Sequence, residues 1–171
     1  MVKHRNPSWL VVALVGACAA DVSPHAAAPQ QSDTRTLVGK PAPPFALHAI
    51  SGSDSADLAG LAGHVVLVDF WASWCKPCTA SVPLLNAWRA KYDVRIIGVS
   101  SDDANEIAHY ATQNQVGFTV AHDDGEKVAA AYLVGSLPTL VVIDKTGIVR
   151  YIDVGARDLT AVETEVVGLI E

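Results

Sequence analysis

From about residue 38 onward, short apolar runs alternate with longer segments in which apolar positions recur at helical spacing. Residues 65–71 are almost continuously apolar and rich in β-branched side chains, which is typical of a central strand buried on both faces. Residues 95–100 have a similar composition and are expected to form another buried strand. Shorter strands are expected over 45–50 and 118–121, and residues 139–144 and 148–154 flank a turn sequence that indicates a hairpin.

Four helices are expected between and after these strands. They cover residues 77–91 (with Pro83 inside, a predicted kink), 102–114 (with Asp102 or Asp103 as N-cap), 126–133 and 158–170. Strands that alternate with helices and end in a hairpin and a helix predict an α/β fold, with a central mixed β-sheet flanked by helices.

Composition agrees with one folded domain. The chain has 171 residues, of which 50% are hydrophobic and 18% charged, and its formal net charge is −6. This balance excludes wholesale disorder, and the absence of a basic stripe argues against nucleic acid as a partner. With only three cysteines, the chain is not a small fold held together by disulfides.

The N-terminus has the pattern of an export signal. Lys3 and Arg5 precede an apolar stretch over residues 9–17, which is too short for a stable membrane span. The following residues are rich in Ala, Pro, Gln, Ser and Asp without an apolar period. We therefore expect a lipoprotein-type signal peptide over 1–17, a flexible tether over 18–37 and a folded domain over 38–171.

Residues 15–18 (VGAC) resemble the bacterial lipobox, in which small residues precede a cysteine that is lipidated and becomes the new N-terminus. This resemblance implies lipidation at Cys18, and acyl chains would anchor the protein to a membrane. An ordinary signal peptidase could instead cut after Ala20 or within residues 26–28. In either case the protein is expected to be exported to the periplasm or cell envelope.

The chemistry is expected at residues 69–78, DFWASWCKPC. Cys75 and Cys78 follow a buried strand and open a helix, so one helical turn brings their sulfurs within bonding reach. The positive end of the helix dipole and the cation of Lys76 would stabilise a thiolate on Cys75. Pro77 fits the first helical turn, where its missing N–H costs nothing. The pattern therefore predicts a redox pair.

Two other uses of the cysteine pair are weaker. An inert structural disulfide would close only a very small loop, which gains little from closure. A zinc site would need further ligands, and neither a second cysteine pair nor a nearby histidine pair supplies them.

The segment VDFWASWCKPC resembles the active-site segment of the thioredoxin family, and GSLPT at 135–139 resembles the family's cis-proline loop. The resemblance implies a cis Leu137–Pro138 bond, with Pro138 beside the Cys75–Cys78 disulfide. Pro138 would leave the adjacent backbone free to pair with substrate and would keep metal off the thiols.

The opening VGKPAPPFAL and the long stretch over 102–121 resemble the TlpA/ResA-like branch of exported thiol–disulfide oxidoreductases. This implies a thioredoxin fold with an extra N-terminal strand region and a mid-domain α/β insertion. It also implies protein thiols or disulfides as substrates, a membrane electron donor if the protein is a reductase, a monomer, and no cofactor or metal.

The chain departs from that branch at two positions, and from thioredoxins at a third. Ser81 stands where many members have Glu, and Asp69 stands where many have Asn, although Asp matches the buried acid of thioredoxins. Gly98 occupies the place of the lysine that usually neighbours that acid. The proton-transfer arrangement is therefore left open.

Cys75 is expected to attack and Cys78 to resolve the mixed disulfide. Asp69 would be desolvated, with a raised pKa, and would accept the proton of Cys78; the alternative is a solvated edge position. Trp74 is expected to cover the exposed face beside Cys75, and Trp71 to pack beneath the site.

Within the oxidoreductase class, a reductase is favoured because no His lies inside the motif. Such a reductase would act in cytochrome c maturation or in the rescue of oxidised thiols. Two alternatives use the same fold. A peroxiredoxin-type peroxidase would need Thr and Pro where Ala72 and Val68 stand, and a copper-binding chaperone usually has three residues between its cysteines.

Overall fold

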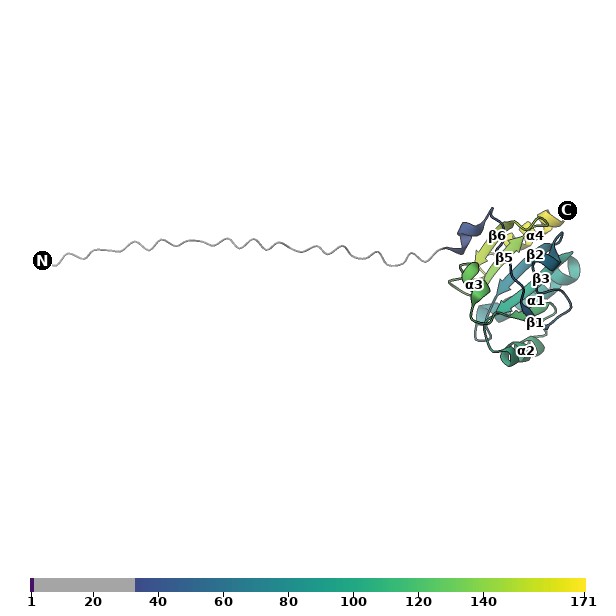
Figure 1. The fold of residues 1–171 in the computed structure, drawn as a ribbon, viewed down its shortest axis with the longest axis horizontal. Helices are drawn as coiled ribbons and strands as arrows, with labels where there is room; N and C mark the ends of the chain where they lie inside the picture. The colour runs from purple at the N-terminus through teal and green to yellow at the C-terminus, as the bar shows by residue number, and fades with distance from the viewer. Residues whose placement is uncertain (2–32) are drawn as a thin grey trace. The chain divides into compact units, whose positions relative to one another are not determined.

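A computed structural model describes Met1 and residues 33–171 (Figure 1). Apart from Met1, the predicted signal peptide lies outside the described residues, as do Cys18 and most of the predicted tether. Among the residues described, no helix is long and apolar enough to cross a bilayer.

In the described part of the chain, six strands form one mixed sheet. Three central strands run parallel to one another, and the strand at one edge and the two at the other pair antiparallel with their neighbours. This confirms the predicted mixed sheet. In spatial order the strands are β1 (His48–Ser51), β4 (Thr119–His122), β3 (Val94–Ser100), β2 (Val65–Phe70), β5 (Thr139–Ile143) and β6 (Val149–Val154).

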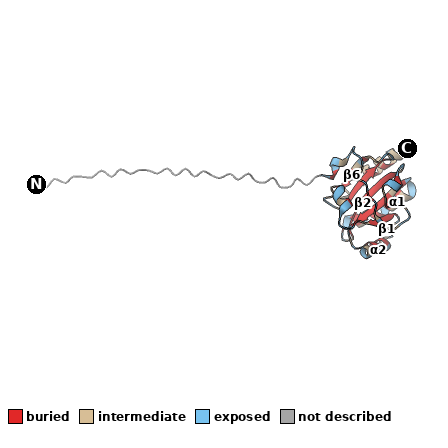
Figure 2. Cartoon of the chain, in the orientation of Figure 1, coloured by how far each residue is buried: buried red, intermediate tan, exposed pale blue. Residues whose placement is uncertain are grey.

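Helices cover both faces of the sheet, as predicted (Figure 1). Side chains of β2 point alternately into two cores, and all six of its residues are buried (Figure 2). One core contains side chains of α1 (Lys76–Lys91), α2 (Ala104–Gln113) and α4 (Leu159–Ile170). The other is covered by α3 (Lys127–Ala131) and the 3₁₀ helices η1 (Thr34–Leu37) and η2 (Ala59–Leu61).

The predicted elements are all present, with ends displaced by a few residues. The strand expected over 45–50 begins only at His48, because Ala46 pairs instead with Asp57 of the following loop. The helix expected over 77–91 is α1, which continues through Pro83 without a break in its assigned range. The main addition is η1, which occupies four residues that the sequence assigned to the tether.

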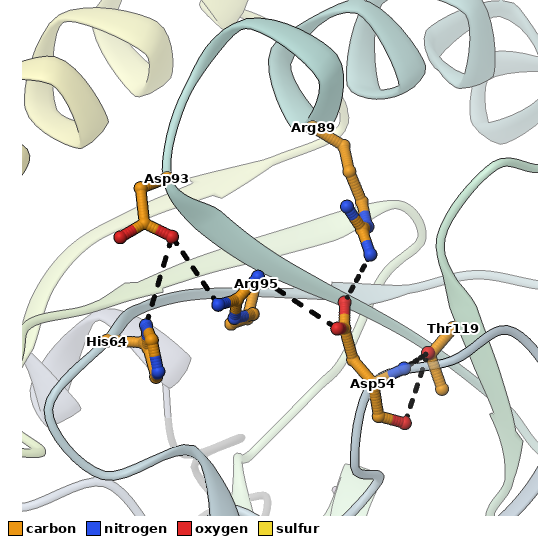
Figure 3. Close-up of polar contacts among 6 residues, drawn as sticks. All are labelled: Asp54, His64, Arg89, Asp93, Arg95 and Thr119. Atoms are coloured by element: carbon orange, nitrogen blue, oxygen red, sulfur yellow. Dashed lines mark hydrogen bonds and ion pairs between the residues drawn. The ribbon is translucent and has the colours of Figure 1, made fainter.

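Ion pairs hold the end of the sheet where β2 and β3 begin (Figure 3). Arg89 Nη2 lies 2.9 Å from Asp54 Oδ2, and Arg95 contacts both Asp54 and Asp93. The backbone N–H of Asp54 donates to Thr119 Oγ1. The network ties the loop after β1 to α1 and β4. The redox cysteines lie after the opposite end of β2, so this cluster is a structural support.

Candidate redox site

Cys75 and Cys78 are joined by a disulfide where the chain passes from β2 into α1. Cys75 is the N-cap of α1, and its Sγ accepts a hydrogen bond from the Cys78 backbone N–H at 3.3 Å. Both side chains are buried, with 3% and 1% of their surfaces exposed. A donor and a helix N-terminus at Cys75 Sγ both favour a thiolate there once the disulfide is reduced.

Three neighbours of the cysteines shape the outer surface. Trp74 is 74% exposed, as expected for a residue that borders the site on the solvent side. Lys76 and Pro77 are also exposed, and Pro77 lies in the first turn of α1, where no hydrogen-bond donor is needed. The exposed surface contributed by the residues next to the two cysteines therefore combines an indole, a cation and a proline ring.

The loop before β5 contains the expected cis peptide bond between Leu137 and Pro138. Thr139 pairs with Phe70 across β5 and β2, so the register brings Pro138 to the same end of the sheet as the redox loop. Gly155 N–H donates to the Pro138 carbonyl at 2.7 Å. Thr139 Oγ1 donates to the Ser136 carbonyl, also at 2.7 Å, which holds the loop from its other side.

An open groove separates the redox loop from the cis-proline loop. Its lining includes Trp74, Leu137, Ser136, Asp102 and Glu126. Apolar walls and backbone from two loops suit an extended peptide segment, and the two carboxylates place negative charge along it.

Asp102 holds the redox loop in a way that the sequence did not predict. Its Oδ2 accepts the backbone N–H of Ser73 at 2.6 Å, whereas Asp103 is the N-cap of α2. Only the position of Asp102 just after β3, the parallel neighbour of β2, could have signalled this contact.

Asp69 is buried, with 2% of its surface exposed, which shows that the alternative of a solvated edge position is wrong. It lies between Gly98 of β3 and Leu140 of β5 in the sheet register. Burial raises the pKa of Asp69 to about 7 because the charged carboxylate is desolvated. Its Oδ1 has no hydrogen-bond partner in the part of the chain that the structure describes.

Trp71 packs in the core beneath the site, as predicted, and its ring stacks on Tyr110 with centroids 4.2 Å apart. Tyr110 O–H donates to Thr79 Oγ1 at 3.1 Å, and Thr79 donates to the Cys75 carbonyl at 3.4 Å. Tyr110 thus connects α2 to the first turn of the redox helix. The sequence pattern did not point to it, because a tyrosine in an amphipathic helix carries no functional signal of its own.

Ser81, at the position where Glu would follow the pattern of the TlpA/ResA-like branch, is buried and donates to the Cys78 carbonyl at 2.8 Å. Its hydroxyl is satisfied within its own helix, so it offers no second acid beneath the disulfide. In the part of the chain that the structure describes, no three His, Cys, Asp or Glu side chains gather into a metal site.

Comparison with known proteins agrees with this geometry. Residues 38–152 match the AhpC/TSA family. The chain belongs to that family. It is similar to the thiol-disulfide oxidoreductase ResA of Bacillus thuringiensis (strain Al Hakam), with 36% identity over 114 residues. The match covers 64% of this chain and 65% of that relative, just under two thirds of its length.

Solved structures give the same result. A thiol:disulfide interchange protein described as DsbE from Chlorobium tepidum shares 33% identity and a TM-score of 0.71, over 78% of this chain and 98% of that one. The thioredoxin domain of a thiol-disulfide oxidoreductase from Bacteroides vulgatus superposes with a TM-score of 0.65 at 25% identity, over 75% and 97% of the two chains. The fold of this AhpC/TSA family member is therefore thioredoxin-like, as the motifs implied.

Proposed function

We propose that the protein is an exported thiol–disulfide oxidoreductase that reduces disulfides in other proteins. The observation that carries this proposal is the Cys75–Cys78 disulfide at the N-terminus of α1. Two further features support it: the cis Leu137–Pro138 bond at the same end of the sheet, and the similarity to ResA.

In the reductive direction, the Cys75 thiolate attacks one sulfur of a substrate disulfide. A Cys75–substrate disulfide forms, and the other substrate sulfur leaves as a thiolate. Cys78 then loses its proton and attacks Cys75 Sγ, which restores the Cys75–Cys78 bond and releases the second substrate thiolate. Two electrons pass from the dithiol to the substrate.

Asp69 is the acceptor for the proton of Cys78. Both residues line one small cavity beneath the disulfide, and a carboxyl whose pKa is about 7 exchanges protons readily near neutral pH. A carboxylate with an ordinary pKa would be a weaker base at this position.

The groove beside Trp74 holds the substrate segment that flanks the target disulfide. The redox loop forms one wall, and Leu137, next to Pro138, forms part of the other. The carboxylates of Asp102 and Glu126 favour a segment that carries positive charge over one that carries negative charge.

Export follows from the N-terminal pattern, with a signal peptide over 1–17 and lipidation at Cys18 that anchors the protein to a membrane. In an oxidising compartment a reductase needs a source of electrons, which a dithiol of a membrane protein would supply. Reduction of cytochrome c precursors before haem attachment is one process in which such a protein would serve.

The reduction potential of the Cys75–Cys78 pair tests this proposal. The protein would be equilibrated in defined thiol buffers, with Cys78→Ser used to trap the mixed disulfide at Cys75 and Cys75→Ser as its control. We expect a potential in the range of thioredoxin-like reductases, roughly −270 to −230 mV, and trapping only by the Cys78 variant. A value above roughly −180 mV would indicate an oxidant or isomerase, and a pair that forms no reversible disulfide would overturn the assignment.

A further inference from the structure

Among the described residues, two buried polar atoms near the redox pair have no hydrogen-bond partner: Asp69 Oδ1, an acceptor, and Trp71 Nε1, a donor. Both residues line the same small cavity, and Cys78 forms another part of its wall. Asp69 is 2% exposed and Trp71 4% exposed. Unsatisfied buried groups are costly and uncommon in native proteins, so a complementary pair around one cavity needs an explanation.

Few other groups in the cavity wall are able to donate a hydrogen bond to Asp69. The O–H of Tyr110, on α2, already donates to Thr79 Oγ1. On α1, the sulfur of Cys78 is bound in the disulfide. The remaining lining side chains are apolar: Val82, Val116, Phe118 and Val120. The cavity also has no space for a water molecule.

The lack of a side chain at Gly98 leaves room for the Trp71 indole beside Asp69. Gly98 pairs with Asp69 across β2 and β3, at the place where thioredoxins usually carry a lysine. A Cβ atom on Gly98 would lie 2.9 Å from Trp71 Nε1, so the indole fills the volume that a side chain from β3 would occupy. The neighbour of the buried acid is therefore a neutral N–H donor in place of a cation.

We propose that Trp71 is a positioning residue whose indole N–H donates to Asp69 Oδ1 when Asp69 loses its proton. This inference rests on the proposed function, in which Asp69 receives the proton of Cys78. The hydrogen bond stabilises the carboxylate before the transfer and is released when the carboxyl becomes neutral. As the proton moves from Cys78 Sγ to Asp69, the sulfur's electron pair forms the bond to Cys75, whose bond to the substrate sulfur breaks.

The first test needs no substitution near the site. The indole ¹H–¹⁵N resonances of the oxidised protein would be followed from pH 5 to pH 9. We expect the Trp71 resonance to shift as Asp69 titrates, with a midpoint below the value of about 7 that burial alone gives, because the hydrogen bond stabilises the carboxylate. This shift should disappear in Asp69→Asn. Trp88 is the internal control, because its indole N–H is also buried without a partner among the described residues, and Trp88 does not line the cavity. A Trp71 resonance that does not titrate would overturn the proposal.

The second test is Trp71→Phe, with Trp88→Phe as the matched control. Loss of the N–H should raise the pKa of Asp69, measured by ¹³C NMR of its carboxyl carbon, by about 1 unit. Trp88→Phe should leave this pKa unchanged. An unchanged pKa in Trp71→Phe, or a lower one because water enters the cavity, would overturn the proposal. If Trp71→Phe does not fold, the titration of the unsubstituted protein decides.

Both tests use the oxidised protein and measure no thiol exchange. Failure of the proposed function would appear separately, as a Cys75–Cys78 pair that does not exchange with thiol buffers while Trp71 still titrates. Failure of this inference alone would leave disulfide exchange intact and the Trp71 resonance constant with pH.

Discussion

Asp69 and Asp144 are both buried, yet their surroundings shift their pKa values in opposite directions. Burial raises the pKa of Asp69 to about 7 because its carboxylate is desolvated, and no described residue donates a hydrogen bond to its Oδ1 in this structure. Burial also acts to raise the pKa of Asp144, but hydrogen bonds from Thr146, Ile148 and Arg150 outweigh it and lower the value to about 2. At the residue scale, the number of hydrogen-bond donors around a buried carboxyl decides whether it keeps or loses its proton near neutral pH.

The raised pKa of Asp69 predicts a pH-dependent stability. Between pH 4 and pH 7 the folded protein holds a proton on Asp69 that the unfolded chain has lost, so stability falls as pH rises through this window. Asp69→Asn removes this effect. We expect the oxidised variant to exceed the unsubstituted protein in unfolding free energy at pH 8 by up to about 4 kcal/mol, and the difference to vanish at pH 4.

Denaturant unfolding at both pH values measures this difference. Asp144→Asn is the control of opposite sign. Because the pKa of Asp144 is lowered, its stabilisation is present at pH 7 and is lost as pH falls toward 2, so this variant should be less stable at neutral pH. An Asp69→Asn effect that is equal at pH 4 and pH 8 would contradict the raised pKa.

At the scale of elements, the turn between β3 and α2 and the helix α2 itself each contribute a side chain that supports the redox loop and the start of α1. Asp102 accepts the Ser73 N–H, and Tyr110 reaches Trp71 and Thr79. The stretch from 102 to 121, which the resemblance identified as an insertion, therefore also supports the segment that carries Cys75.

Variants of the adjacent residues Asp102 and Asp103 distinguish support of the redox loop from support of α2. Asp102→Ala should slow reduction of a disulfide substrate about tenfold, because the redox loop loses a charge-assisted hydrogen bond. Asp103→Ala removes the N-cap of α2, where Asp103 Oδ1 accepts the Asn105 N–H. It should lower the unfolding free energy by about 1 kcal/mol and leave the rate unchanged.

Stopped-flow kinetics and denaturant unfolding on both variants test this assignment. Equal rate losses in the two variants would show that Asp102 acts through general stability of α2. A rate loss only in Asp103→Ala would assign the support of the redox loop to the helix cap.

At the scale of the whole molecule, the N-terminal end of the described domain packs against the loop that leads to the cis-proline. Thr34 is buried, and its Oγ1 donates to the Tyr132 carbonyl at 2.7 Å. Tyr132 is fully buried, and its O–H donates to the Pro43 carbonyl at 2.9 Å. Leu37 packs partly buried against the same core. The folded region therefore includes η1 as well as the predicted range from 38.

A truncation series tests this boundary. A chain that begins at Val38 loses the Thr34 hydrogen bond and the contact of Leu37, and should unfold with about 1–3 kcal/mol less free energy than a chain that begins at Asp33. Thr34→Val in the longer chain isolates the hydrogen bond and should account for about 1 kcal/mol. Equal stability of the two chains, measured by denaturant unfolding, would place η1 outside the cooperative fold.

The sequence by itself determined the strands and helices, because their periodicity and turn residues are local signals. It also determined Cys75 and Cys78, because two cysteines one helical turn apart after a buried strand have a clear chemical use. The cis bond at Pro138 was predictable as well, because GSLPT resembles the cis-proline loop of the thioredoxin family.

Only the tertiary structure decided how the redox pair is supported. The bonds of Asp102 to Ser73, Tyr110 to Thr79 and Thr34 to Tyr132 join residues 29, 31 and 98 positions apart. The cavity that Asp69 shares with Trp71 depends on the register that sets Gly98 beside Asp69. These arrangements follow from strand order and packing, which no local pattern encodes, and they determine the pKa at which the buried acid works.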